Sequence, residues 1–152
     1  MVELRKALAA VVRRCPTGHE VLVFRHPSTS VQLPKGTVED GETIAEATLR
    51  ELAEESGLSL DAEPQLLGSW RRLLDGRFGE APTHDLHVWH VSLIEAPAGL
   101  PHSWSHRATG SEEEEGLEFD YHWLPLDEAL ACQLHPLFAE VVQMLVAHHA
   151  LP

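Results

Sequence analysis

GTVEDGETIAEATLRELAEESGL, residues 36–58, is the most informative stretch of this chain. Thr43 and Glu46 have the Thr-x-x-Glu spacing of a capping box, in which each side chain bonds the backbone of the other at the start of a helix. Gly57 stands where a glycine commonly ends a helix. Residues 44–56 contain neither Gly nor Pro and are rich in Ala, Leu and Glu, which favour helices. The stretch therefore predicts a turn that leads into a helix over residues 44–56.

The predicted helix carries three carboxylates close together. Residues three and four apart share a helix face, so Glu51, Glu54 and Glu55 fall within roughly 100° of one another. Apolar residues occupy the adjoining face: Ala45, Leu49, Leu52 and Ala53. Like charges this close are destabilising unless a proton or a cation neutralises them. Oxygen ligands at this density suit Mg²⁺ or Mn²⁺, and the alternative is an ordinary solvated face of an amphipathic helix.

The stretch resembles the Nudix box at every defined position: Gly36, five residues, Glu42, seven residues, Arg50-Glu51-Leu52, one residue, Glu54-Glu55, one residue, Gly57-Leu58. The resemblance to this hydrolase family implies an α/β (α+β) fold, a Nudix-type α/β/α sandwich around a mixed central sheet. It also implies hydrolysis of a nucleoside diphosphate linked to another moiety, with water attacking a phosphorus atom.

Carried over residue by residue, the resemblance implies that Glu51, Glu54 and Glu55 bind the metal, together with the backbone carbonyl of Gly36. Arg50 would hold these carboxylates by charge-assisted hydrogen bonds, and Glu42 would brace Arg50. We thus expect catalytic roles for Glu42, Arg50, Glu51 and Glu54.

The resemblance allows two kinds of residue as the general base: a box glutamate, or a carboxylate from outside the box. Residues 111–116 read SEEEEG and precede the last predicted strand, where some relatives place an extra acid. Glu114 and Glu115 are the candidates because they lie nearest that strand. The alternative is a solvated acidic loop.

Substrate preference depends on residues beside the box. The lead-in Leu33-Pro34-Lys35-Gly36 resembles the PKG form of dinucleoside polyphosphate and diphosphoinositol polyphosphate hydrolases, so Lys35 would bind a polyphosphate; the alternative is a solvent-exposed lysine in a turn. Trp104 is the candidate for stacking on a base. A dinucleoside polyphosphate is therefore the expected substrate, with a nucleoside triphosphate or a diphosphoinositol polyphosphate as alternatives. A third alternative is a non-catalytic module that senses a nucleotide.

Length and composition predict a single domain over residues 1–152, which the resemblance makes a Nudix hydrolase domain. The formal net charge of −13 argues against nucleic acid as a partner. The resemblance implies a small phosphorylated substrate, a nucleotide derivative, as the partner. No apolar run approaches the length of a membrane span, and we expect no membrane partner. The two cysteines do not make a disulfide framework, and a cytoplasmic location is expected.

Periodicity and turn residues place the remaining elements. We expect strands over residues 4–12, 20–25, 31–33, 64–74, 85–94 and 117–124. Residues 96–116 contain prolines and glycines and are expected to form a long loop, whereas 127–132 and 136–149 are expected to be helical. His87 and His90 raise the question of a zinc site, but three residues apart on a strand they point to opposite faces.

Overall fold

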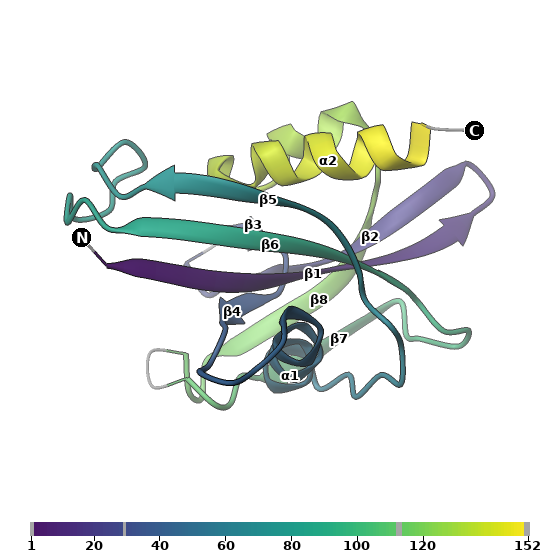
Figure 1. Ribbon diagram of the computed structural model, residues 1–152. Helices are drawn as coiled ribbons and strands as arrows, with labels where there is room; N and C mark the ends of the chain where they lie inside the picture. Colours follow the sequence, from purple (N-terminus) through teal and green to yellow (C-terminus); the bar gives the residue numbers. More distant parts are fainter. Residues whose placement is uncertain (1, 29, 112–113, 151–152) are drawn as a thin grey trace.

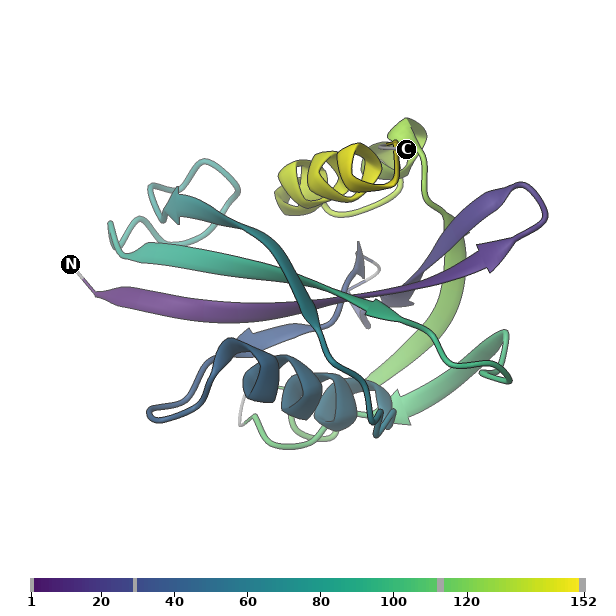
Figure 2. The ribbon, with the colours of Figure 1, turned by 45° about the vertical axis from the view of Figure 1, so that its right-hand side comes forward.

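The computed structural model describes residues 2–28, 30–111 and 114–150. An eight-stranded mixed sheet lies between two helices, α1 on one face and α2 on the other (Figure 1). Turning the molecule by 45° shows the two helices again on opposite sides of the sheet (Figure 2). The expected α/β/α arrangement around a mixed sheet is therefore confirmed.

The elements follow one another along the chain as β1 (Glu3–Cys15), β2 (Gly18–Arg25), β3 (Val31–Gln32), β4 (Lys35–Thr37), α1 (Ile44–Ser56), β5 (Gln65–Leu73), β6 (Leu86–Glu95), β7 (Ser103–Arg107), β8 (Glu118–Pro125), the 3₁₀ helices η1 (Glu128–Cys132) and η2 (Pro136–Phe138), and α2 (Ala139–Ala150). The sheet order is β5-β6-β1-β2-β8-β7, with β3 paired to β2 and β4 paired to β1. β1 and β6 run parallel, and the other pairs are antiparallel.

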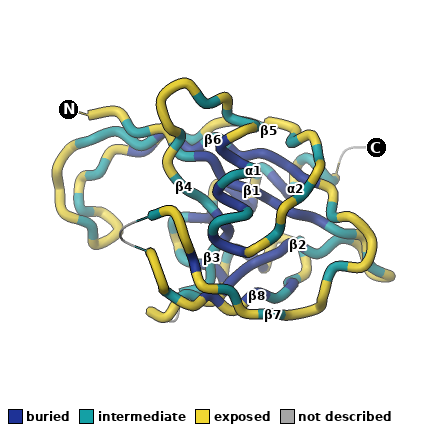
Figure 3. The backbone as a smooth tube through the Cα atoms, turned by 90° about the horizontal axis from the view of Figure 1, so that it is seen from below, coloured by how far each residue is buried: buried dark blue, intermediate teal, exposed yellow. Residues whose placement is uncertain are grey.

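The centre of β1 is buried on both faces, because the sheet is covered on both sides. Leu8, Ala10 and Val12 pack into the core beneath α2, whereas Ala9 and Val11 pack into the core beneath α1. Figure 3 shows this buried centre as a dark layer of strands within exposed loops. The continuous apolar run, which alternates between two cores, is what a strand covered on both faces requires.

Helix α1 begins and ends as the sequence predicted. Thr43 accepts a hydrogen bond from the backbone N–H of Glu46, and the Glu46 side chain accepts one from the N–H of Thr43. Gly57 has a φ of +79° and donates its N–H to the carbonyl of Ala53. A side chain at Gly57 would also meet His106, whose ring carbon lies 2.7 Å from the position of an added Cβ. Glycine is thus required here by conformation and by space.

The expectation of a long loop over residues 96–116 was wrong, because β7 lies inside it and pairs with β8 from Ser103↔His122 to Arg107↔Glu118. Its exposed and half-buried residues alternate, but the stretch is polar and preceded by prolines, so local composition hid it. β1 also continues to Cys15, beyond the expected end of this strand at residue 12.

Two smaller expectations can be compared with the structure. Cys15 and Cys132 are both free, in agreement with the expected lack of a disulfide framework. Within the described part of the chain, no helix is long and apolar enough to cross a membrane.

Candidate active site

Strand β4 contains Gly36, the first residue of the box, and holds it against α1. β4 pairs with β1, and Gly36 lies opposite Ala7. A Cβ added at Gly36 would lie 1.9 Å from the carboxylate carbon of Glu51. The missing side chain therefore makes the space that the Glu51 carboxylate occupies, and it brings that carboxylate against the backbone of β4.

Arg50 links the acidic residues of the box into one network. Its Nε and Nη2 donate to the two carboxylate oxygens of Glu42, at 2.6 and 2.9 Å. Nη1 donates to Glu51 at 2.8 Å and to Glu54 at 3.1 Å, and Nη2 also donates to the carbonyl of Thr37. A guanidinium can form this fork, and an ammonium group cannot. The sequence-predicted bracing of Arg50 by Glu42 is thus present in the geometry.

The network shifts the acid–base properties of its members in opposite directions. The hydrogen bonds from Arg50 hold the pKa of Glu42 below its ordinary value. The pKa of Glu51 is raised by burial, although Arg50 opposes the rise. Glu42 is therefore a stable counter-charge for Arg50, whereas Glu51 carries a carboxylate that burial makes costly to ionise.

Glu55 is the most buried acid of the site, with 3 % of its surface exposed. One of its carboxylate oxygens, Oε2, is buried without a hydrogen-bond partner among the described residues. Burial and the nearby Glu114 raise the pKa of Glu55 well above its ordinary value, and Lys35 opposes the rise with its charge and a backbone hydrogen bond. A buried carboxylate oxygen without a partner is a place where a cation would supply the missing interaction.

The carboxylates do not form a closed metal cluster as they stand, since no three His, Cys, Asp or Glu side chains among residues 2–28, 30–111 and 114–150 are grouped tightly enough to hold an ion. Arg50 Nη1 takes up part of this space by bonding both Glu51 and Glu54. The donor set nevertheless fits Mg²⁺ or Mn²⁺: all side-chain ligands are oxygens, Glu55 Oε2 lacks a partner, and Gly36 leaves room beside Glu51.

The two candidate extra acids of the acidic loop, Glu114 and Glu115, have different interactions. Glu114 acts electrostatically on Glu51 and Glu55, so it lies at the carboxylate site. Glu115 instead accepts a hydrogen bond from the backbone N–H of Gly110 at 3.0 Å and so closes its own loop. Glu112 and Glu113 lie outside the described residues. The electrostatic effect of Glu114 on Glu51 and Glu55, and the backbone contact of Glu115, favour Glu114 over Glu115 as the extra acid.

Gly110 is a site residue that the sequence did not reveal. A Cβ added there would lie 2.3 Å from the carboxylate carbon of Glu54, and its φ is +82°. The neighbouring Thr109 donates its backbone N–H to the carbonyl of Glu54 at 3.0 Å. The loop after β7 is thus fastened to the end of α1, and Gly110 leaves space for Glu54. Nothing local in the sequence marks this glycine, because its partner, Glu54, lies 56 positions earlier in the chain.

The two expected substrate contacts have different surroundings. The Lys35 ammonium lies 5.1 Å from the centre of the Trp89 ring and acts on Glu55, so it borders the carboxylates. Trp104 stacks on Tyr121 with ring centres 5.2 Å apart, and its N–H donates to the carbonyl of Ser56. The stacking of Trp104 on a base stays a prediction.

Tyr121 was missed by the sequence reasoning. Its hydroxyl is buried without a partner among the described residues, and burial together with Glu55 and Glu114 raises its pKa. Its contact with this site arises from the pairing of β8 with β2 and β7, which the sequence did not predict.

Comparison with known proteins identifies this arrangement. Residues 4–145 match the NUDIX domain family, which is most of the chain. The chain belongs to the Nudix hydrolase family. No curated protein sequence matches it significantly.

Solved structures share the Nudix fold at low sequence identity. The Caenorhabditis elegans Ap4A hydrolase is 15 % identical, with a TM-score of 0.62 over 97 % of this chain and 98 % of the other. The Escherichia coli dihydroneopterin triphosphate pyrophosphohydrolase is 17 % identical, with a TM-score of 0.66 over 97 % and 99 %. The NUDIX domain of Shewanella oneidensis NrtR, solved with ADP ribose, is 17 % identical, with a TM-score of 0.59 over 94 % and 88 %. At these identities the likeness shows the fold.

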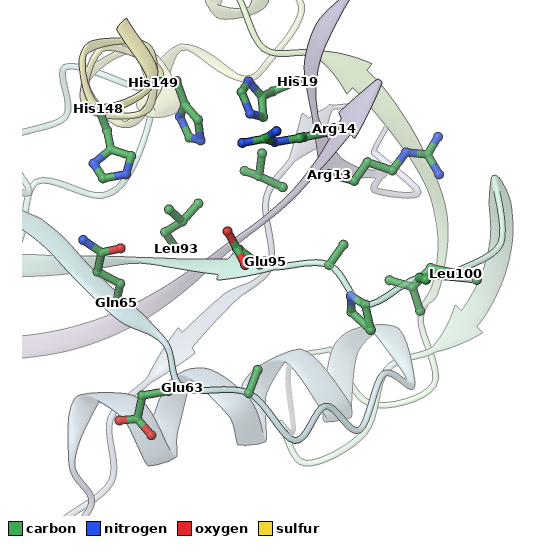
Figure 4. Close-up of a pocket in the computed structure, with 16 residues that line it drawn as sticks. Arg13, Arg14, His19, Glu63, Gln65, Leu93, Glu95, Leu100, His148 and His149 are labelled. Carbon is green, nitrogen blue, oxygen red and sulfur yellow. The ribbon is translucent and has the colours of Figure 1, made fainter. Parts of the chain in front are cut away.

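A large cavity of this Nudix domain, about 990 Å³, involves none of the box residues. It lies between the C-terminal ends of β1 and β6 and the end of α2. Figure 4 shows His19, His149 and Arg14 facing it from one side and Glu95 from another. Because it combines exposed charges of both signs and lies apart from the carboxylates, we do not assign it to the active site.

Proposed function

We propose that this Nudix domain is a Mg²⁺-dependent (or Mn²⁺-dependent) pyrophosphohydrolase that cleaves a phosphoanhydride bond of a nucleoside diphosphate derivative, best a dinucleoside polyphosphate. The observation that carries the proposal is the buried Glu55 carboxylate, whose Oε2 has no partner within the described part of the chain, together with the charges of Glu51 and Glu114 that act on it. Burying acids together is unfavourable for stability alone, so the arrangement supports a function that brings positive charge.

In this proposal Glu51, Glu54, Glu55 and the Gly36 carbonyl hold the metal. A divalent ion bound there would polarise the phosphoryl oxygens and lower the pKa of a bound water. Arg50 sets the positions of Glu51 and Glu54 through its two hydrogen bonds from Nη1, and Glu42 holds Arg50 in turn.

We assign Glu114 the role of the extra acid, as a further ligand or as the base that accepts a proton from the attacking water. Its support is its electrostatic contact with Glu55 and Glu51. A general base must be within reach of the proton that it takes from the attacking water. Glu115 is committed to the backbone of its own loop.

The substrate preference is supported by Lys35. Its ammonium group lies 5.1 Å from the centre of the Trp89 ring, and its charge acts on the Glu55 carboxylate, so it would supply positive charge for a polyphosphate bound at this site. The fold is shared with an Ap4A hydrolase and with a triphosphate pyrophosphohydrolase, so a nucleoside triphosphate and a diphosphoinositol polyphosphate remain the alternatives.

The test is product analysis on four substrates with Mg²⁺: a dinucleoside tetraphosphate, a nucleoside triphosphate, a nucleotide sugar and a diphosphoinositol polyphosphate. We expect the dinucleoside tetraphosphate to have the highest kcat/KM, and EDTA to abolish turnover. Glu55→Gln should lower kcat by at least about a hundredfold. The matched control is Glu63→Gln, which makes the same change at an exposed glutamate. Equal activity of both variants would contradict the metal-ligand assignment.

A second candidate function is binding of a nucleotide derivative without cleavage. The observation in its favour is that the NrtR domain, which shares this fold, was solved with ADP ribose. The complete box, with Arg50, Glu51, Glu54 and Glu55 all present, favours the enzyme. Saturable binding of a nucleotide by the wild-type chain with Mg²⁺, but no product over hours, would establish the second candidate instead.

A further inference from the structure

Two buried polar atoms near the end of α1 lack a hydrogen-bond partner within the described part of the chain: Oε2 of Glu55 and the hydroxyl of Tyr121. Both residues are almost fully buried, with 3 % and 1 % of their surface exposed. They come from two elements that pack against each other, α1 and β8. A buried polar atom without a partner costs free energy, so two of them in one region require an explanation.

The ring of Tyr121 is fixed next to the last turn of α1. Trp104 pairs with Tyr121 across β7 and β8 and stacks on its ring, with ring centres 5.2 Å apart and an angle of 11° between the planes. The Trp104 N–H donates to the carbonyl of Ser56, at the end of α1, at 2.8 Å. From β2, the Phe24 ring lies with its centre 5.3 Å from that of Tyr121. These contacts hold the ring, and therefore its hydroxyl, in one place.

Glu55 lies on the face of α1 that packs on the same strands. Leu52, three residues before Glu55, is fully buried in the core cluster that contains Tyr121 and Phe24. Residues three apart share a helix face, so Glu55 continues this buried face towards the end of the helix. His106 of β7 contacts the backbone carbonyl of Glu55 at 3.1 Å. Strands β7 and β8 therefore hold both the backbone of Glu55 and the tyrosine near its side chain.

Electrostatic effects agree with this placement. Burial, Glu55 and Glu114, in that order, raise the pKa of Tyr121, so its hydroxyl keeps its proton and can donate a hydrogen bond. Glu55 acts on Tyr121, yet the two groups are not bonded directly, because each lacks a partner among the described residues. A bound water can span a gap that is too long for a direct hydrogen bond. Glu114, whose charge acts on both groups, can accept the second proton of such a water.

We propose that the Tyr121 hydroxyl donates to a bound water, which in turn donates to Oε2 of Glu55, so that Tyr121 is a positioning residue for this carboxylate. The inference rests on the proposed hydrolase, in which Glu55 is a metal ligand, and it adds a residue from outside the box to that site. Groups that orient a metal ligand strengthen metal binding without touching the ion. One bond from a neutral donor does not offset the burial of Glu55 beside Glu114, so the site still favours a cation.

The first experiment is Tyr121→Phe, which removes the hydroxyl and keeps the stacked ring. Thermal unfolding is measured in EDTA at neutral pH. We expect the Tm to fall by about 2–6 °C, because the substitution leaves the buried water and Oε2 of Glu55 with one partner fewer. A rise in Tm would overturn the proposal, since removal of an unpartnered buried hydroxyl stabilises a protein.

The second experiment separates positioning from a purely structural role. Mg²⁺ is titrated calorimetrically into the wild type, into Tyr121→Phe and into the matched control Thr48→Val. The control removes another buried hydroxyl of α1, one that donates to the carbonyl of Ile44 within the helix. We expect the Kd for Mg²⁺ to rise by about tenfold in Tyr121→Phe and by less than about twofold in Thr48→Val. An unchanged Kd in Tyr121→Phe, or an equal rise in both variants, would contradict the positioning role.

A crystal structure of the metal-free chain tests the water itself. We expect one ordered water within hydrogen-bond distance of both the Tyr121 hydroxyl and Oε2 of Glu55. A direct bond between these two groups, or a hydroxyl bonded only to some other group, would show that the proposed link is wrong.

The two proposals fail separately. If the wild-type chain hydrolyses none of the four substrates but Tyr121→Phe lowers the Tm and weakens Mg²⁺ binding, the hydrolase is refuted and the positioning role stands. If the wild type hydrolyses its substrate with Mg²⁺ and Tyr121→Phe has a higher Tm with an unchanged Kd for Mg²⁺, the positioning role is refuted and the hydrolase stands.

Discussion

Glu55→Gln is expected to stabilise the metal-free protein while it removes activity. Glu55 is 3 % exposed, and its Oε2 has no partner among the described residues. Glutamine has nearly the same volume and can keep the backbone hydrogen bond from Lys35 at its carbonyl oxygen. The change thus removes a buried charge without opening a cavity, and any effect on stability reports the electrostatics of the site.

The magnitude follows from the burial of the unpaired oxygen. A buried polar group without a partner costs about 1–3 kcal/mol, and a charged one more. The glutamine amide stays polar in the same place, so the substitution removes only part of this free-energy cost, about 1–2 kcal/mol. For a domain of this size, 1 kcal/mol shifts Tm by about 2–4 °C, which gives an increase of about 2–8 °C in EDTA at neutral pH.

The pH dependence has a definite sign. The pKa of Glu55 is raised in the folded state above its ordinary value of 4.5, mainly by burial and by Glu114. Between these two pKa values Glu55 binds a proton more readily in the folded chain than in the unfolded chain. The contribution of Glu55 to the free energy of unfolding is therefore greatest below pH 4.5 and is lost as the pH rises through the folded pKa. The difference in Tm between Glu55→Gln and the wild type should therefore be small near pH 4 and should grow as the pH rises.

The assay is thermal unfolding of both proteins in EDTA between about pH 4 and pH 8, repeated with Mg²⁺. Mg²⁺ should raise the wild-type Tm and should raise that of Glu55→Gln less, because at a fixed concentration a ligand that binds more weakly stabilises the folded state less. Glu63→Gln serves again as the exposed control. A lower Tm of Glu55→Gln in EDTA at pH 7, or a difference that does not change with pH, would refute the reasoning.

Three further changes test other parts of the site. Arg50→Lys keeps the charge but loses the fork, so we expect kcat to fall by about tenfold to a hundredfold and Tm to fall by several degrees, measured by turnover and by melting. Gly36→Ala forces the Glu51 carboxylate to move, since the new Cβ would lie 1.9 Å from its carbon, and Mg²⁺ titration should show at least about tenfold weaker binding. Glu114→Gln should lower kcat by at least about tenfold with Tm nearly unchanged; Glu115→Gln should instead destabilise by about 0.5–1 kcal/mol with less effect on kcat, and the reverse pattern would exchange their roles.

The chemistry of the box was readable from the sequence because its determinants are local. The capping box, the C-terminal glycine and the helical spacing of Glu51, Glu54 and Glu55 all lie within 36–58, where backbone geometry alone sets which side chains share a face. The hydrogen bonds of Arg50 to Glu42, Glu51 and Glu54 span at most eight positions. Short sequence separation is what made this part predictable.

Strand β7 and the surroundings of Trp104 could not be predicted from the local sequence. β7 exists because it pairs with β8, and its polar, proline-flanked sequence does not reveal that pairing. Trp104 packs on Tyr121 across the same pairing, a contact that the local sequence did not reveal. Local propensity is weak for strands, since cross-strand neighbours supply much of their stability.

The sequence by itself determined the family, the helix with its carboxylates and the Arg50 brace, because each depends on residues close together in the chain. Only the tertiary structure showed that Glu115 is held by the backbone of its own loop, and why Gly110 is needed beside Glu54. It also placed Lys6, Lys35 and His87, from three strands, on one face of the sheet. Contacts of this kind depend on sheet register, which long-range packing sets and local sequence does not.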